Sequence, residues 1–273
     1  MNKLILLGIL VILGIYLFVS APPPIDSTIA RESSTDIATY DVLDTLNEIN
    51  SQARYVYTHL IVGEGKEVGL KFGEEWSKPD VLQGPLPAQF LRLISQQMER
   101  KPPMLGLYLG SDEPINKSNL FSENQMATFQ KIKMSKAPSY YYDDLFGEVA
   151  MYPDVATVIG CVDCHNSHPD SPKKDWVLGD IMGATTWTYP EKNISFDTYM
   201  EIVTDFFSSI EEAYTVYLEK TRSFDTPPTI GKLWPGNNQI QLPSSEIFID
   251  EVKKRSAYYA FNHLLYHRRG EKR

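Results

Sequence analysis

The two cysteines of this chain stand three residues apart and are followed at once by a histidine, in the pentapeptide Cys161-Val162-Asp163-Cys164-His165. C-x-x-C-H is the attachment motif for c-type haem, in which each thiol adds across a vinyl group of the porphyrin and the histidine is the proximal ligand of the iron. The pattern predicts one covalently bound haem c, held by Cys161 and Cys164 with His165 on the iron. We expect the rest of the chain to be organised around this segment.

Three other uses of a C-x-x-C pattern fit less well. A thioredoxin-like redox pair needs a βαβ context and has no use for the trailing histidine. A zinc knuckle needs a second pair of ligands at metal spacing. A structural disulfide between such close residues closes a very small loop and adds little stability.

Length and composition bound the class of protein. A chain of 273 residues predicts one or two domains, and 42% hydrophobic with 12% aromatic residues fits a globular protein with a sizeable core. The net charge of −9 argues against a nucleic-acid partner.

The N-terminus predicts attachment to a membrane. An unbroken apolar run from Leu4 to Val19 follows Lys3, and acidic residues follow the run. We interpret residues 1–21 as an uncleaved single-pass anchor, with a cleaved signal peptide as the alternative. The distribution of charge places the bulk of the chain on the periplasmic or extracytoplasmic side, where haem c is attached.

The hydrophobic periodicity predicts the order of the elements. Helices are expected over about 35–61, 87–100 and 119–134, and strands over about 104–109, 140–142, 148–152 and 179–189. Two further helices are expected after Ser195 and after Ser244 or Ser245. The predicted organisation is an anchor at 1–21, a linker at 22–34, a haem-binding domain at 35–190 and a helical C-terminal extension at 191–273.

From the motif onward the sequence resembles a known family. The residues from Cys161 to Lys173, followed by Asp175-Trp176, Gly179-Asp180 and Gly183, closely resemble single-haem c-type sensor domains. Such domains occur alone in photosynthetic bacteria or as the extracytoplasmic part of nucleotide cyclases and histidine kinases. The segment Gly84-Pro85-Leu86-Pro87 and the pair Tyr57-Thr58 also fit, so the resemblance covers about residues 40–187.

The resemblance implies an α+β, PAS-like fold, with a central antiparallel sheet, flanking helices and one haem c. In this chain the domain would be preceded by a transmembrane helix and followed by a helical tail. The chain departs from the family in two respects. Its tail carries no cyclase or kinase signature, and no cysteine is left to act as the distal ligand that a better-known member of the family is thought to use.

The residue on the distal side of the iron is open. His59 borders the apolar face of a distant helix and is our prediction for the distal metal ligand, the alternative being a histidine in ordinary packing. His168 lies too close to His165 in sequence to reach the opposite side of the ring. Met104, Met126 and His263 remain as further candidates.

Two residues near the motif are predicted to contact the cofactor. The resemblance places Trp176 against the haem. Lys173 is a candidate partner for a haem propionate, because an ammonium group forms charge-assisted hydrogen bonds to carboxylates, and the alternative is a solvated loop.

The predicted function is redox or gas sensing by a membrane-anchored cytochrome that signals to a protein partner. The alternative is an electron-transfer subunit of a membrane redox complex. An enzyme is not expected, since no acid–base residues indicate an open distal site.

Overall fold

The structure is a computed structural model that describes residues 36–103 and 105–268, with side chains described as far as Tyr258. The predicted anchor at 1–21 and the predicted linker at 22–34 lie outside the described residues. Within the described ranges, no helix has the length and apolar character needed to span a bilayer. The elements in chain order are β1 (Ile37–Ala38), α3 (Thr39–Tyr55), η1 (Val56–Gly63), α4 (Glu64–Glu67), α5 (Pro87–Met98), β2 (Gly106–Gly110), η2 (Lys117–Asn119), α6 (Glu123–Ser135), β3 (Ser139–Asp143), β4 (Gly147–Val155), α7 (Ile159–Ser167), β5 (Ile181–Tyr189), β6 (Asn193–Ile194), α8 (Phe196–Thr221), β7 (Thr229–Gly231), β8 (Gln241–Pro243) and α9 (Ser245–Arg268).

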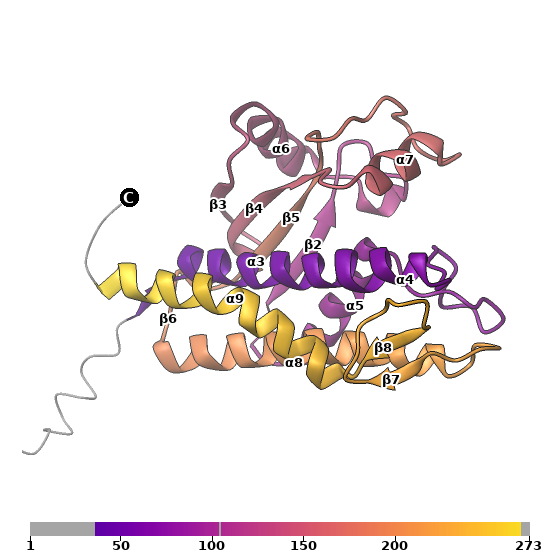
Figure 1. The fold of residues 1–273 in the computed structure, drawn as a ribbon. Coiled ribbons are helices and arrows are strands. Elements are labelled where there is room, and N and C mark those ends of the chain that lie inside the picture. The colour runs from indigo at the N-terminus through magenta and orange to yellow at the C-terminus, as the bar shows by residue number, and fades with distance from the viewer. Residues whose placement is uncertain (1–35, 104, 269–273) are drawn as a thin grey trace, which may run out of the picture. The chain divides into compact units, whose positions relative to one another are not determined.

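A four-stranded antiparallel sheet in the order β2-β5-β4-β3 forms the centre of the fold (Figure 1). Side chains of a strand alternate between the two sides of a sheet, and strand β4 is buried on both sides because a hydrophobic core lies on each. Ala150 and Tyr152 belong to the main hydrophobic core, whereas Met151 belongs to a smaller core that it shares with Phe129 of α6. The predicted α+β architecture, with an antiparallel sheet and flanking helices, is confirmed.

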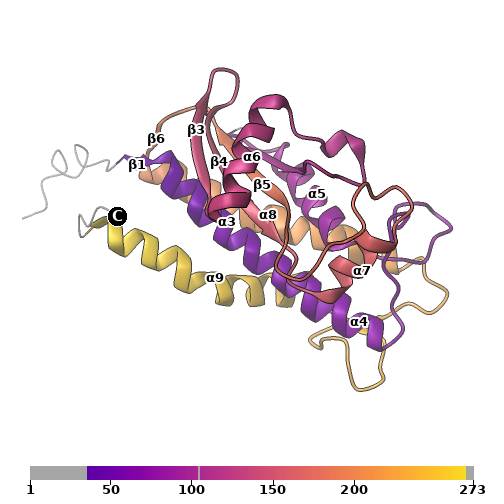
Figure 2. The ribbon, with the colours of Figure 1, turned by 90° about the horizontal axis from the view of Figure 1, so that it is seen from above.

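The helices α3, α8 and α9 lie along one side of this sheet (Figures 1 and 2). Helix α3 presents Val42, Leu46 and Ile49 to the core at three- and four-residue steps. Phe206 of α8 and Phe248 of α9 belong to the same core. The predicted division at residues 190 and 191 stays a prediction about domains, but the packing of the C-terminal helices is continuous with that of the sheet.

The long first helix changes its winding before it ends. The predicted helix over 35–61 is α3 followed by η1, an eight-residue π-helix, and by α4. Within η1, the fully buried Tyr57 stacks on Phe90 with ring centroids 4.0 Å apart, and its hydroxyl donates a hydrogen bond to the carbonyl oxygen of Pro85 at 2.7 Å. Tyr57 therefore ties the rod formed by α3, η1 and α4 to the Pro-Leu-Pro segment that starts α5.

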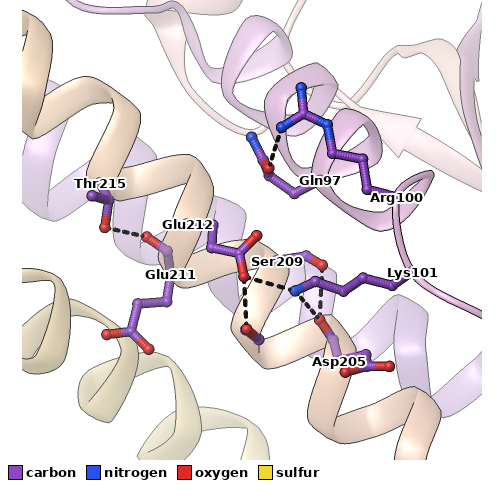
Figure 3. Close-up of polar contacts among 9 residues, drawn as sticks. Gln97, Arg100, Lys101, Asp205, Ser209, Glu211, Glu212 and Thr215 are labelled. Carbon is purple, nitrogen blue, oxygen red and sulfur yellow. Dashed lines mark hydrogen bonds and ion pairs between the residues drawn. The ribbon is translucent and has the colours of Figure 1, made fainter.

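A polar cluster joins the end of α5 to α8 (Figure 3). The ammonium group of Lys101 donates to Glu212 Oε1 at 2.9 Å and to the carbonyl oxygen of Asp205 at 3.4 Å. Ser208 also donates to Glu212 at 2.9 Å.

Helix α8 begins at its predicted cap, where the Ser195 side chain accepts a hydrogen bond from the backbone N–H of Thr198 at 3.2 Å.

Candidate functional site

The C-x-x-C-H motif lies entirely on one short helix, α7, between the end of β4 and the start of β5. Residues three and four apart share a face of an α-helix, so Cys161, Cys164 and His165 lie on neighbouring positions of one side. Val162 between them is buried, and both thiols are free. Helix α7 thus presents two thiols and an imidazole together.

Trp176 packs behind this helix. It is 5% exposed and forms a small core with Val162 and Ala156. The side chain of Asn166 makes two hydrogen bonds of 2.9 Å to the backbone of Trp176, accepting from its N–H and donating to its C=O. The indole ring meets the ring of His165 edge-on, with centroids 6.4 Å apart. The structure therefore brings Trp176 to the motif and shows that Asn166 holds it there.

Charged residues of the first rod, of β4 and of the loop after α4 lie near the two thiols, and α7 lies over the C-terminal half of that rod (Figure 2). Cys161 is in the electrostatic field of Arg54 and Asp154, which form an ion pair at 2.7 Å. Cys164 is in the field of Glu74 and Lys66. Sequence reasoning missed these groups, because only the folded chain brings residues 54–74 to residue 161.

Glu74 is held in place by two interactions. Its backbone carbonyl accepts a hydrogen bond of 2.7 Å from the side chain of Gln89, and its carboxylate lies 3.3 Å from Nε2 of His168. His168 ends α7 and its Nδ1 accepts from the backbone N–H of Asp170 at 3.2 Å. His168 is therefore engaged beside the motif, on the same side of α7 as the cysteines.

Burial determines the protonation of the motif. It raises the pKa of the Cys161 and Cys164 thiols, so both are thiols at neutral pH. The reactive cysteine of a thioredoxin-like pair has a lowered pKa, and this site lacks that property. Burial, and next the nearby His168, lowers the pKa of His165, which favours the neutral imidazole that binds metal ions. Among the described residues there is no cluster of three or more His, Cys, Asp or Glu side chains that could hold a metal ion.

The other predicted site residues lie as follows. His59 stands on η1, with its ring 4.3 Å from that of Tyr55. The groups that shift the pKa of His165 are His168, Asp154 and Glu74, so His59 is not among them. Lys173 forms an ion pair with Asp175 and lies 4.7 Å above the ring of Trp176. The roles of His59 and Lys173 stay predictions.

The remaining candidates for the distal ligand are Met126, Met104 and His263. Met126 packs against the core under the sheet, together with Phe121 and Phe129. Met104 lies outside the described residues, and so does the side chain of His263.

A protein-family model described as Tll0287-like matches residues 31–190, which is more than half of the chain. The chain belongs to the Tll0287-like family. The match confirms the family resemblance seen around the motif. A solved structure titled as the crystal structure of the cyanobacterial heme-protein Tll0287 is similar over 56% of this chain and 95% of that chain, at 10% identity and a TM-score of 0.38. No curated protein matches.

The Tll0287-like match ends just after β5, at residue 190. Helices α8 and α9 lie beyond it, yet they share the main core with α3 and α5. Helices outside the family match therefore pack against the same core as helices inside it.

Proposed function

We propose that this protein is a membrane-anchored, extracytoplasmic protein with one haem c, that it senses redox state or a diatomic gas, and that it is not an enzyme. The observation that carries the proposal is the presentation of Cys161, Cys164 and a neutral His165 together on α7. Membership of the Tll0287-like family, whose solved relative is titled a heme-protein, supports it.

The residues present fit haem c. Two free thiols at the required spacing can form two thioethers, and His165 is available as the proximal ligand. Nδ1 of His165 and Nε1 of Trp176 are buried without a hydrogen-bond partner among the described residues. Buried polar atoms are normally paired, so these two indicate that the site is completed by a further group. When bound, haem supplies an iron that changes oxidation state and can take a sixth ligand.

We further infer that the sheet is of the PAS type. In the order β2-β5-β4-β3, the first strand of the sheet along the chain, β2, lies beside the last, β5. The two strands between them in the chain, β3 and β4, form a hairpin. This supports the PAS-like arrangement that the family resemblance implies.

Sensing is favoured over electron transfer by the contacts of His59. The π-helix is a rare form that often marks functional sites, and η1 carries His59 as part of it. The ring of His59 packs on Tyr55, and the guanidinium of Arg255 in α9 lies 4.7 Å above the ring of Tyr55. A movement of the imidazole would therefore disturb the contact between α3 and α9. A partner that contacts α9 would receive the signal.

The test compares optical spectra of the oxidised and reduced protein, with and without CO, in the wild type and in His59→Ala. His168→Ala is the matched control, because it removes an imidazole that Glu74 already engages. We expect a c-type pyridine haemochrome, an altered spectrum in His59→Ala only, and a response of the reduced protein to CO. Absence of the haemochrome would refute the whole proposal. A six-coordinate spectrum in both oxidation states that ignores CO would instead establish an electron-transfer protein.

A further inference from the structure

Three segments that are distant in sequence meet where the chain enters the described domain. Strand β1 pairs with β6, directly before α8 begins at Phe196. The turn between β3 and β4 reaches the same end, because Glu148 pairs with Tyr189. Gly147, the first residue of β4, lies so close to Pro190 that an added Cβ would be 2.5 Å from the Cα of Pro190. Figure 2 shows β1 and β6 together at the start of α3, with the β3–β4 hairpin projecting above them.

This end exposes large apolar side chains. Leu145, at 87%, is the most exposed large hydrophobic residue among those the structure describes, and Phe146 beside it is 56% exposed. Tyr142 is 64% exposed on β3, in the same hairpin. Exposed apolar residues that are gathered together mark interaction sites, whereas single ones need no explanation. Tyr142, Leu145 and Phe146 belong to one hairpin, and we call these three residues the entry patch.

The course of the chain indicates what covers the entry patch. The residues before Asp36 include the apolar run from Leu4 to Val19 and the predicted linker at 22–34. A linker of that length spans at most roughly 45 Å when fully extended, so the end of the domain at Asp36 stays close to any bilayer that holds the run. Leucine, phenylalanine and tyrosine side chains are favoured at the headgroup level of a membrane.

We propose that the entry patch docks on the surface of the membrane and fixes the orientation of the domain. The inference rests on the membrane anchor of the proposed function. A tether raises the effective concentration of the patch at the bilayer to the millimolar range, so a contact that is weak in free solution is sufficient. Asp143 and Asp144 precede Leu145 in the same turn, and their charge favours zwitterionic phosphatidylcholine over anionic lipid.

The test uses the full chain in phosphatidylcholine vesicles. Leu145→Trp places a fluorescent reporter in the entry patch, and Leu233→Trp is the matched control. Leu233 is 61% exposed and lies between β7 and β8, at the other end of the domain in Figure 1. We expect brominated phosphatidylcholine to quench the added emission of Leu145→Trp at least about twofold more than that of Leu233→Trp, since only the first reporter is at headgroup depth. Equal quenching would overturn the inference.

A second measurement tests the patch without a reporter. A protease site in the predicted linker allows the anchor to be cut off after reconstitution, and the fraction of domain that sediments with the vesicles is measured. We expect Leu145→Ser with Phe146→Ser to lower the partition constant by about a hundredfold relative to Leu233→Ser, from the burial of two large apolar side chains. Equal partition of the two variants would contradict docking. Flotation of the uncut chain separates the two failures: a chain that does not float with vesicles refutes the anchor and this inference together, but leaves haem attachment standing.

Discussion

The clamp between Asn166 and Trp176 allows a quantitative test of how the motif helix is held. Asn166→Ala removes both 2.9 Å hydrogen bonds to the backbone of Trp176. Each such bond contributes about 0.5–1.5 kcal/mol net, and the unpaired backbone groups of a residue that is 5% exposed add to the loss. We expect the free energy of unfolding to fall by about 2 kcal/mol, measured by urea denaturation followed by far-UV circular dichroism.

Two further variants sharpen this test. Ser167→Ala, on the next residue, removes only hydrogen bonds from an exposed hydroxyl to the carbonyl oxygens of Asp163 and Cys164 within the same helix, and we expect a change below about 0.5 kcal/mol. Asn166→Asp keeps the acceptor for the Trp176 N–H but loses the donor to the Trp176 C=O. The stability of this variant should therefore lie between those of Asn166→Ala and Ser167→Ala. A loss in Asn166→Ala no larger than that in Ser167→Ala would refute the reasoning.

Three other predictions concern the scaffold beneath the site. Tyr57→Phe leaves the Pro85 carbonyl without its buried donor and should destabilise the fold by about 1–2 kcal/mol in urea denaturation, with the haem spectrum unchanged. Ser195→Ala removes the N-cap of α8 and should cost about 1 kcal/mol, seen as a lower Tm. Burial raises the pKa of Glu212, but the hydrogen bonds from Lys101 and Ser208 and the charges of Lys101 and Arg100 together outweigh it, and the net pKa lies below the ordinary 4.5. This contribution is present above pH 4.5 and is lost as the pH falls below it. Because Glu212 is 45% exposed, Lys101→Met should cost less than about 1 kcal/mol at pH 7, and the difference should shrink towards pH 3 in denaturation curves.

Much of the secondary structure could be predicted, because local patterns set it. The three- and four-residue spacing of Val42, Leu46 and Ile49 predicted α3, and Ser195 predicted the start of α8. The π-helix η1 could not be predicted, since its winding follows from tertiary packing around Tyr57 rather than from a periodic pattern. For the same reason the sequence identified His59 as a candidate but did not show that its ring packs on Tyr55.

The sequence alone determined which side chains the motif presents together, because the spacing of Cys161, Cys164 and His165 is local and survives in any short helix. It also determined the family, through the residues that follow the motif. Only the tertiary structure decided what surrounds the thiols: Arg54 and Asp154 on one side, Glu74 on the other, and Trp176 behind. Arg54 and Glu74 come from segments about a hundred residues away from the motif, and the free energy that brings them there comes from burial in a shared core, which no window of sequence contains.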